Sequence, residues 1–418
     1  MKQDIKSNPT NEYSLKNDYD VIVTGAGPSG LMAAITASRG GKDVLVIEQK
    51  DIPLKKIYAT GNGRCNFTNL TFDDKAFRGE KTEFAYNAYK RFDNEALIEF
   101  MRSIGVISKD ISGYVYPYNE QARTIAQALL FECRRLGVTI ICSTRVVDIT
   151  KDDDDRFAVI TDSGKNFKSC DIVVAVGGKA SPTHGSDGNL NKVIRKLGHE
   201  IILQRPALVP LKFEDKKFSD LAGVRLKCKV TILIDGEKTQ NETGEIIFNK
   251  DNISGIPVMQ LSRYATKALD EKKSVSLKLD LFPDMEADEL CKLIKNADSQ
   301  MSILEALGLL TNEKVAQLVV SLCGIKNMRV CEALGSISTA VNTLKEINVK
   351  INGDCGFNRA QVTSGGVDLD HINDSMGSKL IDGLFFAGEI LDVDGTCGGY
   401  NLQWAFTSGY IAGSAISL

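Results

Sequence analysis

The sequence predicts an α/β fold in which one domain, built on a strand–helix–strand unit, is split by an inserted β-rich and helical region. Three observations support this prediction. A short apolar segment at 20–24 runs into a glycine-rich turn and a helix-like segment, and a second apolar segment follows at 43–48. Alternating, strand-like sequence then dominates 205–283, and helical spacing dominates 284–346. Apolar strands and a final helix return after this insert, so the two parts of the α/β domain flank it.

The composition is that of a globular protein with two or three domains. The chain has 418 residues, of which 43% are hydrophobic and 25% are charged. Its 51 Lys and Arg nearly balance 54 Asp and Glu, and the net charge of −3 argues against a nucleic-acid binder with a broad basic surface. Residues 1–18 are polar and no run of 18 apolar residues occurs, so we expect a cytoplasmic protein without a membrane span.

The ten cysteines and three histidines give no metal or disulfide signature. No two cysteines have CxxC spacing, and the histidines do not form a metal-binding motif. We therefore expect reduced, mostly buried thiols and no metal site.

The first part of the α/β domain is expected to alternate strands and helices. An acidic run at 152–155 is interpreted as the solvated tip of a hairpin. The expected elements are strand 20–24, helix 31–39, strand 43–48, helices 95–104 and 121–136, and strands 138–142, 145–150, 157–161 and 171–176.

The insert and the last part of the chain follow a different pattern. Strands are expected at 226–234 and 274–281 with a helix after Pro257, and the chain then becomes helical. Later strands are expected at 347–351, 359–363 and 383–387, before a helix at 402–416. The expected divisions are a polar leader at 1–18, the first part of the α/β domain at 19–204, a β-rich insert at 205–283, a helical insert at 284–346, and the second part of the α/β domain at 347–418.

The motif GAGPSG at 25–30 joins the first strand to the first helix. Its first glycine makes the turn, its second lets the backbone approach a pyrophosphate, and its third packs the helix against the sheet. Glu48 ends the second strand about 20 residues after Gly27, where a carboxylate accepts hydrogen bonds from ribose hydroxyls. Because a carboxylate repels a 2′-phosphate, the motif predicts FAD or NAD in preference to NADP.

Two further glycine-bearing segments favour FAD. Segment 55–69, KKIYATGNGRCNFTN, can supply backbone amides and the Arg64 cation to the flavin, although an ordinary turn with an exposed arginine is the alternative. Segment 383–395 begins with an apolar strand that ends in Gly388 and the acidic Glu389, and GGYNLQ at 398–403 begins the last helix. The N-terminus of that helix would direct partial positive charge at the O2/N1 edge of the flavin.

The segments GAGPSG, TGNGRCNFTN, TSGGV and GLFFAGEILDVDGTCGGYNLQWAFTSGYIAG resemble the BaiN-like family of NAD(P)/FAD-dependent oxidoreductases, from about residue 19 to 418. The resemblance implies a glutathione-reductase-type, Rossmann-like FAD-binding domain with a β-barrel-like and a helical insert, and contact of adenine with the backbone of Val146. A GSTGDG-like stretch common in the family is shorter here, HGSDG at 184–188, so no role is carried over to it. The expected cofactor-binding residues are Gly25, Ala26, Gly27, Pro28, Ser29, Gly30, Glu48, Gln49, Asn62, Gly63, Arg64, Cys65, Asn66, Val146, Gly177, Gly388, Glu389, Asp394, Gly399, Tyr400, Asn401 and Leu402.

The expected reaction passes hydride from transiently bound NADH or NADPH through FAD to an organic small molecule. The sequence has no second convincing GxGxxG motif, so a separate nicotinamide-binding domain is not predicted. The resemblance favours reduction of a C=C bond conjugated to a ketone, as in a 3-dehydro-bile acid or steroid enone. A flavin monooxygenase, an FAD-dependent tRNA-modifying protein and a sensing flavoprotein remain alternatives. The sequence leaves the oligomeric state open.

No catalytic residue is assigned from the sequence. Cys65 and Cys397 are expected near the flavin, yet no basic partner for either thiol is evident, and packing roles are the simpler interpretation. His184 beside a glycine loop is also more simply structural. The alternating tyrosines at 114, 116 and 118 are interpreted as decoration of a strand.

Overall fold

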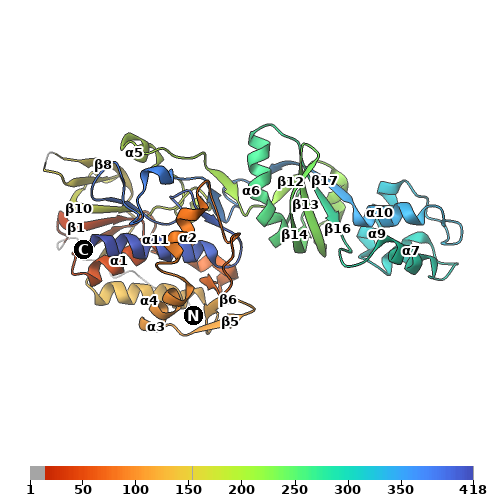
Figure 1. Ribbon diagram of the computed structural model, residues 1–418, viewed down its shortest axis with the longest axis horizontal. Coiled ribbons are helices and arrows are strands. Elements are labelled where there is room, and N and C mark those ends of the chain that lie inside the picture. The colour runs from red at the N-terminus through yellow and green to blue at the C-terminus, as the bar shows by residue number, and fades with distance from the viewer. Residues whose placement is uncertain (1–14, 153, 418) are drawn as a thin grey trace. The chain divides into compact units, whose positions relative to one another are not determined.

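The structure, a computed structural model, describes residues 15–152 and 154–417. These residues form two compact units, each with its own hydrophobic core (Figure 1). The first unit runs to Gln204 and resumes at Val362, and the second spans Arg205–Gln361. Most of the expected polar leader at 1–18 lies outside the described residues, and Asp18 already begins the first strand.

A seven-stranded sheet forms the centre of the first unit. Its order is β7-β2-β1-β10-β9-β8, and β19 pairs with β10. Strands β7, β2, β1, β10 and β19 are parallel, whereas β9 and β8 extend the sheet in antiparallel fashion. The bounds are β1 Asp18–Thr24, β2 Val44–Ile47, β7 Thr139–Ile141, β8 Val146–Lys151, β9 Phe157–Thr161, β10 Asn166–Val174 and β19 Leu384–Phe386.

Buried apolar runs explain the central position of β1 and β2. Residues 21–23 of β1 are fully buried, and all four residues of β2 are buried. Strands that are covered on both faces show continuous apolar runs in place of alternation. Helix α1 (Pro28–Arg39) connects the two strands and packs on α11 (Tyr400–Ile416), and Gly409 and Gly413 let the two backbones meet (Figure 1).

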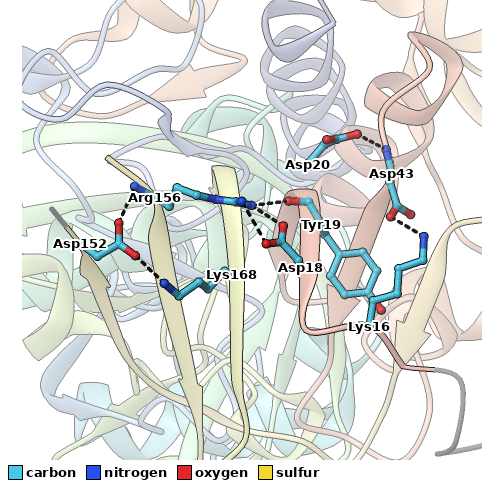
Figure 2. Close-up of polar contacts among 8 residues, drawn as sticks. All are labelled: Lys16, Asp18, Tyr19, Asp20, Asp43, Asp152, Arg156 and Lys168. Carbon is cyan, nitrogen blue, oxygen red and sulfur yellow. Dashed lines mark hydrogen bonds and ion pairs between the residues drawn. The ribbon is translucent and has the colours of Figure 1, made fainter. Parts of the chain in front are cut away.

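Polar contacts connect β1 to the rest of the sheet at the amino-terminal end of the strand, opposite the Gly25 turn (Figure 2). Arg156 Nη1 donates to Asp18 Oδ2 at 3.0 Å, and Lys168 Nζ lies 2.8 Å from Asp152 Oδ2. Because these charges are largely exposed, each pair contributes only about 0.2–1 kcal/mol. The first pair joins β1 to the residue before β9, and the second joins β10 to the residue after β8, all at the end of the sheet that is remote from the carboxyl end of β1. The other residues of this network are Lys16, Tyr19, Asp20 and Asp43.

Short helices and strands surround the sheet in the first unit. The helices expected at 95–104 and 121–136 are present as α3 and α4 within one residue at each end. Strand β6 carries Tyr114 and Tyr116 of the alternating tyrosines, as expected, whereas α2, β3 and β5 were not predicted. Asp93 caps α3 by accepting a hydrogen bond from the Ala96 amide at 2.9 Å. The bounds are α2 Thr82–Tyr89, α3 Asn94–Ser103, α4 Ala122–Arg135, α5 Asn191–Lys196, β3 Thr68–Asn69, β4 Phe77–Arg78, β5 Ser108–Ile111, β6 Tyr114–Pro117, β18 Val362–Ser364 and β20 Asp394–Gly395.

Six antiparallel strands close a barrel in the second unit, in the order β12-β15-β14-β13-β16-β17. The alternating burial of β16 shows side chains pointing inward and outward in turn. The expected β-barrel-like insert is therefore confirmed. The bounds are β11 Arg205–Ala207, β12 Leu211–Phe213, β13 Arg225–Ile234, β14 Glu237–Phe248, β15 Asn252–Gly255, α6 Ile256–Asp270, β16 Val275–Asp280 and β17 Ile347–Asp354.

A helical part lies between β16 and β17. Ser302 and Glu305 form a capping box at the start of α8, and Asn312 caps α9. These local signals explain why short helices begin where they do in a segment with few strand-forming residues. The bounds are α7 Ala287–Lys295, α8 Ile303–Gly308, α9 Glu313–Cys323 and α10 Ile337–Lys345.

One expected boundary is wrong. The sequence places 347–418 in the α/β domain, but β17 pairs with β12 and β16 and closes the barrel. Residues up to Gln361 therefore belong to the second unit, and the expected strand at 359–363 shortens to β18. An apolar strand that follows a helical insert looks the same in sequence whether it returns to the first sheet or closes the barrel.

Candidate cofactor-binding site

The turn at 25–30 brings the carboxyl end of β1 against β10 and the start of α1. Gly25 has a φ of +99°, and a Cβ there would lie 2.5 Å from the carbonyl oxygen of Ala175. A Cβ at Gly30 would lie 1.9 Å from the carbonyl oxygen of Gly25. Because both contacts are with backbone, the turn itself excludes any side chain at these two positions.

Gly27 is different, because nothing in the turn requires it to be glycine. Its φ is −78°, and apart from Gly27 and its two chain neighbours no described residue has an atom within 4 Å of the position that a Cβ would occupy. Gly27 directly precedes α1, whose first residue is Pro28 and whose first turn carries no acidic side chain. The first amides of a helix have no partner within it and attract anions. The open space at Gly27 and these amides form a cradle that suits a pyrophosphate.

Glu48 connects this turn to the end of β2. The residue is only 8% exposed; its Oε2 accepts a hydrogen bond from the Ala26 amide and its Oε1 one from the Lys50 amide, both at 2.8 Å. Burial raises the pKa of Glu48, and these backbone hydrogen bonds oppose the rise. Since each carboxylate oxygen has a second lone pair, Glu48 holds the turn and can still accept a hydrogen bond from a sugar hydroxyl.

Gln49 and Val146 lie in a cluster beyond Glu48. Gln49 Oε1 accepts a hydrogen bond from Arg145 Nη1 at 2.8 Å, and Gln49 Nε2 donates to the carbonyl oxygen of Gly185. The carbonyl oxygen of Val146 accepts one from Asn189 Nδ2 at 3.0 Å. The Gln49 side chain is thus engaged within the protein, and the contact of Val146 with adenine stays a prediction.

The backbone at 60–65 follows an unusual path. Gly61, Asn62, Gly63 and Cys65 all have positive φ, between +54° and +86°, and the 3₁₀ helix Ile57–Gly63 is kinked here. Residues other than glycine rarely adopt such angles, which cost free energy and gather at ligand-binding sites. The sequence predicted a glycine loop here, but nothing in it indicated that Asn62 and Cys65 would also adopt left-handed conformations.

The side chains of this loop are partly engaged by its neighbours. The Arg64 guanidinium lies 4.5 Å from the centre of the Tyr116 ring and forms an ion pair with Glu120. Glu120 therefore neutralises the positive charge of Arg64, which the sequence analysis had suggested for binding the cofactor. Asn66 donates its side-chain amide to two backbone carbonyls, and its Oδ1 is buried with no hydrogen-bond partner.

Gly388 and Glu389 follow β19 and lie against the start of α1. A Cβ at Gly388 would lie 2.5 Å from Ser29 Oγ. Glu389 Oε1 accepts a hydrogen bond from the Thr363 amide at 2.6 Å, and its Oε2 lies 2.9 Å from Lys56 Nζ. The ion pair with Lys56 was not predicted, because the two residues are far apart in the sequence and belong to no shared motif.

Gly177 and Asp394 also lie in the first unit. Gly177 has a φ of +74°, and a Cβ there would lie 2.7 Å from Ser186 Oγ and 3.8 Å from Glu389 Oε2. Asp394 is 2% exposed and lies in β20, where it pairs with Arg78 of β4. Gly177 thus lies close to the Glu389 cluster, whereas Asp394 is buried in a strand pair.

The N-terminus of α11 presents backbone amides. Gly399 precedes the helix with a φ of +96°. Asn401 uses its side chain to bind both the amide and the carbonyl of Gly395, at 2.8 and 2.9 Å. The Tyr400 hydroxyl donates to a backbone carbonyl at 2.8 Å, and burial raises the pKa of Tyr400 to about 12. The free donors that this helix start offers are therefore the first-turn amides at Tyr400, Asn401 and Leu402.

A buried polar network that the sequence analysis missed fixes α11 to the glycine loop. Thr68 Oγ1 donates to Gln403 Oε1 at 2.5 Å, and Gln403 Nε2 donates to Thr407 Oγ1 at 3.0 Å and to the Phe92 carbonyl at 3.2 Å. All three polar side chains are fully buried. The available signal was a glutamine inside a helix that has no charged residue and is mostly buried, since a buried polar group needs partners.

Cys65 does not offer a reactive thiol at this site. Cys65 is fully buried, and burial raises its pKa to about 12, so the thiol stays neutral. The ten cysteines are free, but the expectation that most are buried is wrong: only Cys65, Cys133 and Cys228 are buried, and Cys170 and Cys331 are exposed.

The histidines give no evidence of acid–base chemistry here. Burial, and then the nearby Lys56, lower the pKa of His184, whose Nδ1 lies 3.3 Å from Thr183 Oγ1. Within residues 15–152 and 154–417, no group of three or more His, Cys, Asp or Glu side chains is arranged to hold a metal ion. In the same residues, no helix has both the length and the apolarity to cross a membrane.

Much of the predicted set thus converges within the first unit. The Gly25 turn contacts β10, Glu48 contacts the turn, Gly388 contacts Ser29, and Gly399 contacts the loop at 66–68. Room or bonding capacity is left at the open cradle at Gly27, at the Glu48 carboxylate, at the first amides of α11 and at the unpartnered Asn66 oxygen. An extended ligand with an anionic middle and a polar ring at one end fits this donor set, as a dinucleotide does.

Comparisons with known proteins agree along nearly the whole chain. A family model described as "HI0933-like protein Rossmann domain" matches residues 19–415. A 3-dehydro-bile acid delta(4,6)-reductase of Clostridium scindens is 37% identical over 94% of this chain and 98% of its own length. Ribosomal RNA dihydrouridine synthases of Escherichia coli and Haemophilus influenzae are 27% and 29% identical, over 94% and 95% of this chain and 96% and 98% of theirs.

Solved structures share the fold. A 3-ketosteroid-delta4-(5alpha)-dehydrogenase from Rhodococcus jostii RHA1 aligns with a TM-score of 0.50 and 14% identity over 98% of this chain and 99% of its own. A 3-ketosteroid delta1-dehydrogenase from Sterolibacterium denitrificans aligns with a TM-score of 0.50 and 11% identity over 96% and 100%. At this level of identity, the likeness extends to the fold alone.

Proposed function

The chain belongs to the HI0933-like family of Rossmann-domain proteins, and from this premise we propose that it is an FAD-dependent oxidoreductase that reduces a C=C bond conjugated to a ketone. The observation that carries the proposal is the open cradle at Gly27, set between the Glu48 carboxylate and the first turn of α1. Because the turn has room for a methyl group at Gly27, a glycine at this position is best explained by a ligand that occupies the same space.

The binding roles follow from the geometry of the first unit. The cradle and the α1 amides would hold the pyrophosphate, Glu48 would accept hydrogen bonds from the ribose, and the α11 amides at 400–402 would donate to the carbonyl edge of the flavin ring. Bound FAD supplies the hydride-transfer chemistry that no side chain provides. NADH or NADPH is proposed as the donor.

A steroid or bile-acid enone is the proposed substrate class. The Clostridium scindens relative, matched over almost its full length, is named for reduction of a 3-dehydro-bile acid. In such an enone the ketone makes the β-carbon electrophilic, and the ketone oxygen takes the negative charge that develops as hydride adds. The product has gained one hydride and one proton across the double bond.

A second candidate substrate is uridine in ribosomal RNA. Two relatives named ribosomal RNA dihydrouridine synthases match 94% and 95% of this chain. The C5–C6 bond of uracil is also conjugated to a carbonyl, so the same reduction applies to it. The net charge of −3 and the lower identity of these relatives, 27% and 29%, place this candidate second.

Product analysis tests these alternatives. Purified protein is incubated without oxygen with NADH or NADPH and either a 3-oxo-4,6-diene bile acid or ribosomal RNA, with a Gly27→Ala variant as the control in which the cradle is filled. The proposal predicts that the dienone gains two hydrogens, and that at limiting FAD this happens more slowly with Gly27→Ala than with wild type. Reduction of uridine alone would instead support the RNA candidate, hydroxylated product in air would indicate a monooxygenase, and no turnover of any acceptor would favour a sensing flavoprotein.

A further inference from the structure

The Asn66 side chain has a fixed orientation within the glycine loop. Its Nδ2 donates to the carbonyl oxygens of Thr68 at 2.8 Å and Val115 at 3.0 Å. Only the NH₂ end of an amide can satisfy two carbonyl acceptors, so the assignment of nitrogen and oxygen follows from the bonding. The side-chain oxygen must therefore point away from both carbonyls.

That oxygen has no donor in the described structure, although it is buried. A buried carbonyl without a hydrogen bond costs about 1–3 kcal/mol, and such groups call for an explanation. Asn69, three residues further on, shows the ordinary arrangement. Its Nδ2 donates to the Gly398 carbonyl at 3.0 Å and its Oδ1 accepts from the Thr71 amide at 2.9 Å.

The unpartnered oxygen lies beside the N-terminus of α11. A Cβ at Gly399 would lie 2.8 Å from Asn66 Oδ1 and 2.6 Å from the carbonyl oxygen of Thr68, so Gly399 packs closely against Asn66 and only glycine fits there. Gly399 directly precedes the helix, whose first amides are free donors. One small region therefore offers an acceptor, Asn66 Oδ1, next to backbone donors.

This combination is complementary to a cyclic imide, in which a ring N–H lies next to a ring carbonyl. The pyrimidine ring of a flavin has this edge, and so does uracil. We propose that Asn66 Oδ1 accepts a hydrogen bond from the imide N–H of the flavin while the first turn of α11 donates to the adjacent carbonyl. The inference rests on the proposed function, and it assigns Asn66 as a residue that recognises and orients the flavin ring.

Binding of FAD and of FAD methylated at the imide nitrogen tests the proposal. A methyl group removes the donor and fills the space beside Asn66. Wild-type apoprotein should bind the methylated cofactor at least about tenfold more weakly than FAD, the equivalent of one hydrogen bond. Asn66→Ala should weaken FAD binding and lose this discrimination, and Asn69→Ala should keep it.

A second measurement needs only the wild-type protein, in case Asn66→Ala fails to fold. A hydrogen bond from the neutral imide N–H disfavours its ionisation, so binding should raise the imide pKa above that of free FAD, as read from the flavin absorbance in a pH titration. Equal binding of both cofactors, or an imide pKa unchanged or lowered on binding, would overturn the role of Asn66. Failure to bind any FAD would overturn the proposed function as well.

A third arm separates flavin from uracil as the ligand. FAD-loaded protein is titrated with a uridine-containing oligonucleotide and with the same oligonucleotide methylated at uracil N3. The proposal predicts no discrimination between the two, because Asn66 is already occupied by the flavin. Discrimination by wild type that Asn66→Ala abolishes would reassign the oxygen to the substrate.

Discussion

At the scale of single residues, the glycines of the 25–30 turn divide into two kinds. Gly25 and Gly30 are required by backbone contacts of 2.5 and 1.9 Å that a Cβ would make, whereas Gly27 faces open space. The sequence motif does not distinguish them, because all three are simply glycine. Only the structure shows which glycines the fold requires and which one faces open space.

This difference gives a prediction for alanine substitutions. Gly27→Ala should leave the unfolding free energy of the apoprotein within about 0.5 kcal/mol of wild type, because φ is −78° and the space is open, yet weaken FAD binding at least about tenfold. Gly30→Ala should lower the free energy of unfolding by more than about 2 kcal/mol. Denaturant titration and cofactor titration measure the two effects. Undiminished FAD binding by Gly27→Ala would mean that the cradle does not hold the cofactor.

Glu48 gives a prediction of pH dependence. Burial raises its pKa in the apoprotein, so its ionisation costs stability as the pH rises from 4.5 through the raised value. Ribose hydroxyls that donate to Glu48 favour the ionised form, so FAD affinity should increase over the same pH range. Glu48→Gln should bind FAD more weakly and lose this increase. If the FAD affinities of wild type and Glu48→Gln changed with pH in the same way, Glu48 would be excluded as the ribose ligand.

The part of the site that the sequence could predict is the part encoded by short local motifs. The GAGPSG turn and Glu48 are such features, because a strand, a turn and the next strand end are close in sequence. The Lys56–Glu389 ion pair, the Thr68–Gln403 network and the orientation of Asn66 depend on segments that are distant in sequence. Their pairing is fixed by topology, which no local pattern contains.

At the scale of elements, one carboxylate ties α4 to α1. Glu132 of α4 is 7% exposed and accepts hydrogen bonds from Arg39 Nε of α1 at 3.1 Å and from Arg135 Nε at 2.8 Å. Arg135 first, and then Arg39, hold the pKa of Glu132 at about 2, well below its ordinary 4.5. Since the pKa is lowered in the folded state, the stabilisation is present above pH 4.5 and is lost as the pH falls towards 2.

Glu132→Gln should therefore lower the free energy of unfolding by about 1–2 kcal/mol at pH 7, after allowance for the partly exposed arginines. The difference in unfolding free energy between variant and wild type should disappear as the pH falls from 4.5 to about 2. Glu99→Gln on α3, whose ion pair with Arg102 is fully at the surface, serves as the matched control and should change little. A gap that stays constant with pH would show that the Glu132 ion pairs do not account for the acid sensitivity.

Element positions were predictable where periodicity was strong. Helices α3 and α4 and strand β9 lie within one residue of expectation. Strand β17 was assigned to the wrong unit, and the short β5, which pairs with β6, was not recognised as a strand. An element's existence follows from its own sequence, but its partners follow from long-range pairing.

At the scale of the whole molecule, each unit has its own core, and the predicted cofactor residues lie in the first. Trp404, the chain's one tryptophan, is 1% exposed in the first unit and donates to the Gly388 carbonyl at 3.1 Å. Tryptophan fluorescence therefore reports on unfolding of the unit that binds the cofactor.

FAD at about 100 times its Kd should stabilise that unit by about 2.7 kcal/mol. The thermal transition seen by Trp404 should rise by about 5–10 °C, with the calorimetric transition of the barrel unit unchanged. Apoprotein with and without FAD gives the comparison, and AMP in place of FAD controls for weak binding by the adenosine end. Equal shifts of both transitions would show that the units unfold together.

The whole-chain resemblance inferred from the sequence is confirmed by the family match over residues 19–415 and by the 37% identical relative, and with it the oxidoreductase class. The motifs that carried it lie at the two ends of the chain and meet in one unit. The substrate could not be predicted in the same way. Its contacts depend on side-chain arrangements that no family-wide motif encodes.

Anaerobic absorbance spectroscopy of the purified protein tests the central claim most directly. NADH or NADPH is added to FAD-loaded protein, excess donor is removed, and a 3-oxo-4,6-diene bile acid is then supplied. The account predicts that the flavin band bleaches with the nicotinamide and returns with the dienone, in proportion to the product formed. A protein that retains no flavin and cannot be reconstituted with FAD, or a reduced flavin that the dienone leaves bleached, would contradict it.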